Sequence, residues 1–241
     1  MAGRVHIGTS GFHYKHWVGL FYPEGTKPHQ MLPFYIRHFH TVEMNNTFYQ
    51  LPASSTFEAW RENTPKPFCF AVKASRFITH MKKLKDPEES IANFFLRIEL
   101  LERKLGPILF QLPPRWKLDT PRLAAFLKVL PAQHKYVFEF RDETWLVPQV
   151  FKLLAEHNAA FCIHDLGEMK TPIEITADFT YVRFHGPSSA KYSGSYPDRQ
   201  LEEWARRIRG WRKELSSIYV YFNNDVGGCA VKNAMDLKRL C

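Results

Sequence analysis

The chain has 241 residues, with 33 Lys and Arg against 24 Asp and Glu, so its formal charge is +9. Apolar residues make up 45% and charged residues 24%, which excludes a disordered or collagen-like chain. No run of about 18 apolar residues indicates a transmembrane helix, and no apolar leader follows the N-terminus. With four scattered cysteines and no CxxC pair, we expect reduced thiols and a cytoplasmic protein.

Short apolar runs alternate with longer amphipathic stretches along the whole chain. The runs predict eight strands, at residues 4–8, 41–45, 68–73, 107–111, 136–141, 160–164, 181–185 and 218–223. The stretches between them predict helices near 28–40, 54–63, 86–105, 120–130, 144–157, 197–213 and 228–239. The link between the sixth and seventh strands is short and contains Pro172, so we expect its helix to be missing or reduced.

Strict alternation of strands and helices favours right-handed crossovers and a parallel sheet. Eight such units in this length predict a single (β/α)₈ TIM barrel over residues 1–241. A doubly wound open sheet is the alternative. It is disfavoured because the first strand is followed by no Gly-rich dinucleotide fingerprint and the chain has no phosphate-binding P-loop motif.

Polar side chains gather where the predicted strands end. Residues two apart share a face of a strand, and in a barrel one face points inward. This parity turns a polar set inward near the carboxyl ends of seven strands, the end where barrel enzymes carry out their chemistry. The set comprises Glu43, Asn45, Lys73, Gln111, Glu139, Arg141, His164, Arg183, His185 and Asn223, with Tyr49 and Asp225 in the adjoining loops.

The same segments resemble a known family. The match runs through Gly8-Thr9-Ser10-Gly11-Phe12, Val42-Glu43-Met44-Asn45-Asn46-Thr47-Phe48-Tyr49, Phe110-Gln111-Leu112-Pro113-Pro114, Phe138-Glu139-Phe140-Arg141, Val182-Arg183-Phe184-His185-Gly186 and Tyr221-Phe222-Asn223-Asn224-Asp225. This pattern is similar to the YecE-like family, also called domain of unknown function 72. The resemblance implies a TIM-barrel fold and leaves the reaction open.

Two carboxylates and several cations define the chemistry that we expect. Glu43 and Glu139 are candidates for a general acid and base, together with His185, although Arg141 beside Glu139 could equally make it an ion-pair strut. The cationic side chains match phosphate or carboxylate groups. We therefore predict an enzyme of the hydrolase or isomerase type that acts on an anionic, phosphorylated or phosphodiester, small molecule. The substrate-binding candidates are Lys73, Gln111, Arg141, His164, Arg183, Asn45, Tyr49, Asn223 and Asp225.

Two alternatives remain open. A divalent metal is conceivable, because His164, His185 and the acidic side chains are suitable ligand types, but neighbouring Lys and Arg oppose a cation. Nucleic acid is the other candidate partner, bound by the aromatic loop at residues 12–22 and by a basic rim that comprises Arg76, His80, Lys82, Lys83 and Lys85. We prefer that loop as a lid packed on the barrel mouth. The sequence does not give the oligomeric state.

Overall fold

Eight parallel strands form a nearly closed barrel in the computed structural model, which describes residues 2–188 and 192–241. The order around the barrel is β2-β3-β4-β5-β6-β8-β9-β1, so each strand lies beside the next parallel strand of the chain. The strands are β1 (Arg4–Thr9), β2 (Thr41–Met44), β3 (Cys69–Lys73), β4 (Leu105–Gln111), β5 (Tyr136–Glu139), β6 (Ala160–Leu166), β7 (Met169–Lys170), β8 (Phe179–Phe184) and β9 (Ser217–Phe222).

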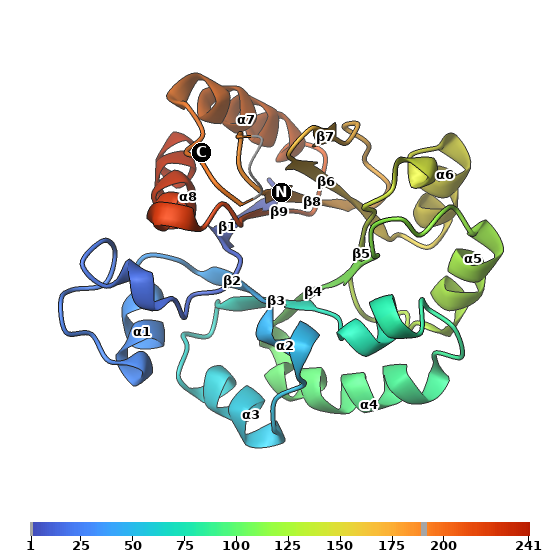
Figure 1. Ribbon diagram of the computed structural model, residues 1–241, viewed down its shortest axis with the longest axis horizontal. Helices are drawn as coiled ribbons and strands as arrows, with labels where there is room; N and C mark the ends of the chain where they lie inside the picture. Colours follow the sequence, from blue (N-terminus) through green and yellow to red (C-terminus); the bar gives the residue numbers. More distant parts are fainter. Residues whose placement is uncertain (1, 189–191) are drawn as a thin grey trace.

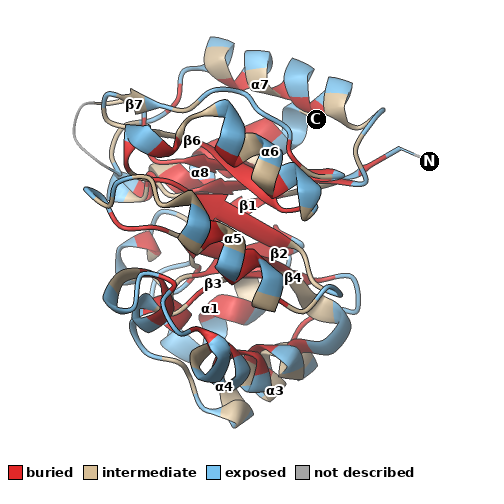
Figure 2. Cartoon of the chain, turned by 90° about the vertical axis from the view of Figure 1, so that its right-hand side faces the viewer, coloured by how far each residue is buried: buried red, intermediate tan, exposed pale blue. Residues whose placement is uncertain are grey.

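The helices lie around the outside of these strands (Figure 1). They are α1 (Pro28–Tyr35), α2 (Asn46–Tyr49), α3 (Ser54–Glu62), α4 (Glu88–Ile98), α5 (Thr120–Val129), α6 (Pro148–Glu156), α7 (Asp198–Trp211) and α8 (Cys229–Leu240). Their outer faces are exposed and the strands between them are buried (Figure 2). The TIM-barrel prediction is confirmed. Among the helices in the described residues, none is long and apolar enough to cross a membrane.

The link after β6 contains no helix, as its sequence predicted. β7 turns back and pairs antiparallel with the end of β6, with Asp165 opposite Lys170. The next eight residues, all of them described, form neither helix nor strand before β8 begins at Phe179. The seventh and eighth predicted strands are therefore β8 and β9.

Several predicted helix ends were wrong by a turn or more. α4 ends at Ile98 rather than at 105, because Glu102 takes a non-helical φ of 51° in the turn that follows. The predicted helix at 144–157 divides into a short turn and α6, which begins with Pro148 in its first turn. The predicted helix at 28–40 ends at Tyr35. The short helix α2, directly after β2, was not predicted.

Side chains fill the barrel in the alternating pattern that the sequence predicted. One buried cluster lies inside the barrel and contains Ala71, Leu109, Val137, Cys162, Tyr181 and Tyr221. A larger cluster packs the opposite faces of the strands against the helices and contains Val72, Phe110, Phe138 and Val182. The parity that separates these clusters also turns the polar strand-end residues inward.

The seam between β1 and β2 closes the barrel without a regular ladder. The strands meet at a single bridge, Ser10 with Glu43. Farther along the seam the fully buried Tyr35 hydroxyl accepts a hydrogen bond from the Thr9 amide at 3.1 Å and donates to the Thr41 carbonyl at 3.0 Å. A side chain from α1 thus replaces part of the missing backbone pairing.

Candidate functional site

A buried ion network occupies the barrel at the carboxyl end of its strands. Arg183, at the end of β8, lies between Glu43 of β2 and Glu139 of β5, and its side chain is 1% exposed. One guanidinium nitrogen lies 2.7 Å from Glu43 Oε1 and the other lies 2.5 Å from Glu139 Oε2. Because burial of unpaired charge is costly, Arg183 serves as a counter-ion for both carboxylates and so joins β8 to β2 and β5.

Neutral donors complete the surroundings of Glu43. The Tyr181 hydroxyl donates to its Oε2 at 2.6 Å, and the Ser10 hydroxyl donates to its Oε1. Arg183 also donates to Ser10 Oγ at 3.2 Å. Ser10 therefore helps to hold a carboxylate, and Tyr181, whose role the sequence did not reveal, belongs to the same network.

Glu139 is held in its ionised form by two guanidinium groups. Burial by itself would raise the pKa of this carboxyl, but Arg141 and Arg183 hold the pKa well below its ordinary value. Arg141 contacts Oε1 through its Nε, while Arg183 contacts Oε2. A carboxylate so strongly paired is held in its ionised form, so this geometry favours the ion-pair strut over a proton donor.

His185 is a neutral imidazole within the network. Burial, reinforced by Arg141 and Arg183, lowers its pKa well below the ordinary value. Its Nε2 lies 3.0 Å from Arg141 Nη2, which can only donate, so Nε2 accepts and the ring proton is on Nδ1. Nδ1 lies 3.1 Å from the side-chain amide of Asn223, and we assign the amide oxygen to that position.

His164 lies beside Glu139 and His185 in the network, and one of its ring nitrogens has no partner among the described residues. Its Nε2 donates to the Phe140 carbonyl at 2.9 Å, and its buried Nδ1 has no partner among the described residues. Burial lowers the pKa of His164 to about 4, so this ring is neutral as well.

Three buried side chains of the network are of metal-ligand type. Ligand atoms of Glu139, His164 and His185 lie within 4.8 Å of one another. However, both Glu139 oxygens form ion pairs with guanidinium groups, and His185 Nε2 accepts a hydrogen bond from Arg141. A divalent cation would have to displace Arg141 and lie beside two positive charges, so these residues do not fit a metal.

Lys73 is the cation of the site that lacks an acidic partner. Its side chain is partly exposed at the end of β3, and its Nζ lies 4.2 Å from the centre of the Phe48 ring. Within residues 2–188 and 192–241, no carboxylate or acceptor pairs with this amine. Burial and the Arg183 charge lower its pKa to about 7, and the Glu139 and Glu43 charges oppose that shift only in part.

The other predicted site residues divide between the mouth and its loops. Gln111, Asn45 and Asn223 are partly exposed at strand ends around the ion network. Asp225 lies away from it, where its carboxylate accepts from Trp17 Nε1 at 2.6 Å and pairs with His16 at 2.9 Å. Asp225 thus fixes the first loop, and Tyr49 is 79% exposed on α2.

The first loop packs against α1 in the outer core, where Phe21 and Tyr22 contact Phe34, and within the described residues no contact of its rings places it over the ion network as the expected lid. Trp17 and Tyr22 are fully buried and Phe12 is 9% exposed, so these rings are not available to stack on nucleic-acid bases. The sequence also missed Asp165, which accepts from the His185 amide at 2.9 Å and from the Tyr196 hydroxyl. Strand parity predicts that Asp165 points outward, toward Tyr196. Its hydrogen bond with the His185 amide depends on the register between β6 and β8, in which Asp165 pairs with Phe184.

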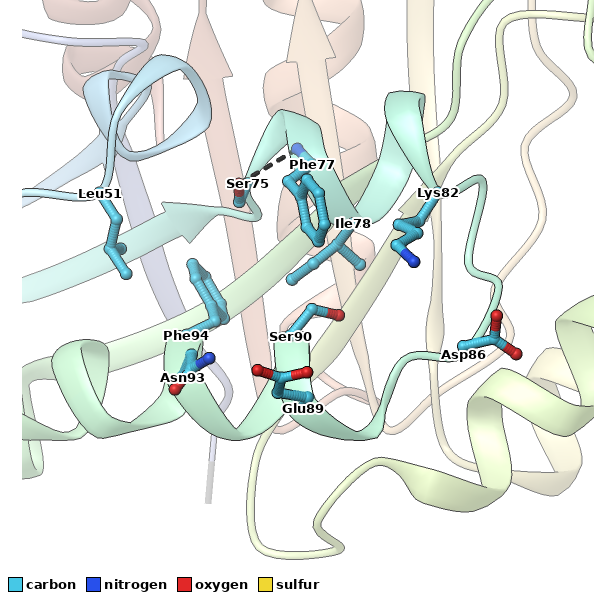
Figure 3. A pocket seen from close by; sticks show the side chains of 10 residues that line it. All are labelled: Leu51, Ser75, Phe77, Ile78, Lys82, Asp86, Glu89, Ser90, Asn93 and Phe94. Carbon is cyan, nitrogen blue, oxygen red and sulfur yellow. Dashed lines mark hydrogen bonds between the residues drawn. The ribbon is translucent and has the colours of Figure 1, made fainter.

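A separate hollow of about 370 Å³ lies outside the barrel, between the segment after β3 and α4 (Figure 3). Ser75, Ile78, Lys82, Glu89 and Phe94 line it. Among the described residues around this hollow, none belongs to the ion network, so its shape gives no argument about the site.

Comparison with known proteins identifies the family. A family model described as a protein of unknown function, DUF72, matches residues 6–241. The chain belongs to the DUF72 family. This confirms the YecE-like resemblance, since the chain is also 31% identical to YecE of Escherichia coli K12 over 61% of its own length and 50% of that protein. It is 28% identical to YunF of Bacillus subtilis over 98% of this chain and 94% of YunF.

Solved DUF72 structures share the fold. A DUF72 protein from Thermotoga maritima is 31% identical and superimposes with a TM-score of 0.87 over 98% of each chain. One from Enterococcus faecalis is 21% identical, with a TM-score of 0.83 over 98% of this chain and 94% of that chain. These likenesses support the barrel architecture and name no ligand.

Proposed function

We propose that this DUF72 protein is an enzyme that binds a phosphorylated or phosphodiester small molecule at the barrel mouth and acts on it by acid–base chemistry. The observation that carries the proposal is Lys73, a partly exposed amine with no acidic partner among the described residues. An anion bound there would supply the missing negative charge. The same residue would then be the proton donor.

The balance of charge supports an anionic ligand. Arg141 and Arg183 are matched by Glu43 and Glu139, so the guanidinium charges are already neutralised inside the protein. Lys73 remains as the excess positive charge. Because opposite charge favours the charged form of an amine, binding of an anion would raise the pKa of Lys73 from about 7.

Lys73 is also the best placed group for proton transfer near neutral pH. A general acid works best when its pKa lies close to the working pH. The bound anion would keep the amine protonated. As water attacks phosphorus and the ester P–O bond breaks, the amine would give its proton to the leaving oxygen, and a proton of the attacking water would return to the amine. In this scheme Glu139 and His185 orient Arg141, and Glu43 balances Arg183, rather than exchanging protons with the substrate.

Binding of sulfate at two pH values tests the proposal. Sulfate remains a dianion over this range, so any change with pH comes from the protein. If bound sulfate keeps the amine charged, affinity falls about 30-fold from about pH 6 to about pH 8.5, since the free amine loses its proton near pH 7. Isothermal titration calorimetry measures both affinities.

Three variants show where the effect originates. Lys73→Met removes the charge and should abolish the pH dependence, while Lys73→Arg keeps the charge and should bind sulfate equally at both pH values. Lys82→Met is the matched control, because Lys82 is an exposed lysine with its Nζ over another ring, that of Phe77. The proposal fails if wild-type protein does not bind sulfate, or if Lys73→Met binds it as wild type does.

Turnover tests the chemical half of the proposal. Wild-type protein should release product from at least one member of a panel of phosphate mono- and diesters, with a kcat/KM that falls above about pH 7 as Lys73 of the free enzyme loses its proton. Lys73→Met should lose that rate. A rate that persists in Lys73→Met, or that increases steeply above pH 7, contradicts Lys73 as the acid.

A further inference from the structure

A cavity beside the mouth has a different character from the charged centre. It has a volume of about 540 Å³ and lies between the first loop, the end of β2 and helices α2 and α3. Its size falls within the range of small-molecule pockets. The residues that line it include Gly11, Tyr14, Asn45, Tyr49, Thr56 and Trp60.

The cavity adjoins the ion network through the seam between β1 and β2. The Gly11 amide donates to the Glu43 carbonyl at 2.7 Å, and the Tyr14 hydroxyl donates to the Ser10 carbonyl at 2.6 Å. Two residues of the cavity wall therefore contact the backbone of residues whose side chains are in the network.

Helix α2 connects the cavity with Lys73. The Thr47 hydroxyl donates to the Lys73 carbonyl at 2.7 Å, and the Phe48 ring faces Lys73 Nζ. The next residue, Tyr49, packs its ring 5.0 Å from that of Phe48 and lines the cavity. Helix α2 thus contacts the unpaired amine of Lys73 through Phe48 and lines the cavity through Tyr49.

The cavity wall combines aromatic rings with one unused acceptor. Tyr14, Tyr49 and Trp60 contribute ring surface. Asn45 Oδ1 is buried and has no hydrogen-bond partner among the described residues. A buried acceptor without a partner costs free energy, and a ligand with a donor at its edge would remove that cost.

We propose that this cavity binds a planar ring carried by the same anionic ligand, with a polar ring edge that donates a hydrogen bond to Asn45. The ligand class is a phosphate ester of an aromatic or heteroaromatic ring compound. The placement of the anionic end of this ligand at Lys73 rests on the proposed function. The ring subsite is tested separately from that placement.

Three phosphate esters divide the proposal into its parts. Methyl phosphate carries the anion alone, phenyl phosphate adds a ring, and 3-hydroxyphenyl phosphate adds a donor at the edge of the ring. Since stacking of a ring on aromatic side chains contributes on the order of 1–3 kcal/mol, phenyl phosphate should bind at least about fivefold more tightly than methyl phosphate. The hydroxyl compound should bind more tightly again.

Two variants locate the ring. Thr56→Trp fills the cavity from α3 and should remove the preference for phenyl over methyl phosphate, while binding of methyl phosphate is unchanged. Asn45→Leu keeps the shape of the side chain and should remove only the advantage of the hydroxyl compound. Ser90→Trp, in the hollow of Figure 3, is the control and should bind all three esters as wild type does.

The outcomes separate the two proposals. Equal binding of methyl and phenyl phosphate by wild-type protein, or a ring preference that survives Thr56→Trp, overturns the ring subsite and leaves the anion site standing. Loss of methyl phosphate binding in Lys73→Met supports the anion site independently of the ring. No binding of any of the three esters overturns both proposals.

Discussion

Replacing Arg183 by Met should destabilise the protein strongly, because it removes the shared counter-ion of two buried carboxylates. The Arg183 side chain is 1% exposed, while those of Glu43 and Glu139 are fully buried. Breaking a buried ion pair by removing one partner costs about 3–5 kcal/mol, since the remaining charge is left uncompensated. Glu139 retains Arg141, so most of the cost falls on Glu43.

Urea unfolding of wild type, Arg183→Met and a matched surface control measures this cost. The control is Arg61→Met, which removes an exposed pair with Glu102 and should lower the free energy of unfolding by at most about 1 kcal/mol. Adding Glu43→Gln to Arg183→Met should restore part of the lost stability, because the uncompensated charge is then gone.

The response to acid has a predicted sign as well. The pKa of Glu139 in the folded protein is held below its ordinary value, so its stabilising contribution is present above the ordinary pKa of about 4.3 and is lost as pH falls through the lower folded value. In Arg183→Met this loss should be shallower, because Arg141 alone lowers the pKa of Glu139 less than the two guanidinium groups do together. Arg183→Met with less than about 1 kcal/mol of destabilisation, or with wild-type acid sensitivity, would refute the reasoning.

Three further predictions concern the seam between β1 and β2, the partly buried His6, and metals. Tyr35→Phe should lower the free energy of unfolding by about 1–3 kcal/mol in urea titrations, because the Thr41 carbonyl loses its donor. An unchanged free energy of unfolding would contradict the stabilising role of Tyr35 in the seam. Burial lowers the pKa of His6 from 6.5 to about 4, so stability falls as pH drops through that window. In His6→Phe the loss of stability between about pH 6.5 and pH 4 should be smaller than in wild type. An equal loss in both proteins would contradict the lowered pKa of His6. Elemental analysis of protein purified without an affinity tag should find no stoichiometric divalent metal. A bound metal that is lost when Glu139, His164 or His185 is replaced would contradict the conclusion that these residues do not fit one.

Strand parity and the barrel rule were sufficient to bring the charged residues together. Glu43, Glu139 and Arg183 were predicted on inward faces at one end, and the structure joins them in one network. Parity holds because side chains alternate along every strand, whatever the register between strands. The prediction of a missing helix after the sixth strand also followed from local features, the short link and Pro172.

The pairing of these residues could not be predicted, because it depends on the stagger between strands. Parity did not show that Arg183 bridges two carboxylates, which turns Glu43 and Glu139 from apparent acid–base groups into counter-ions. It also did not show that Lys73 remains unpaired beside Phe48, since α2 has only four residues and gives no periodic signal. Asp225 was predicted at the mouth, but its carboxylate accepts a hydrogen bond from Trp17 and holds the first loop.

The titration of the Lys73 amine, followed by NMR of protein labelled with ¹³C at the lysine ε-carbons, tests the central claim most directly. Lys73→Arg assigns the signal. Without an added anion the ε-carbon signal should titrate near pH 7, and saturating sulfate should move its midpoint to a higher pH. A midpoint near the ordinary lysine value of 10.5, or a midpoint that sulfate leaves unchanged, would contradict the account.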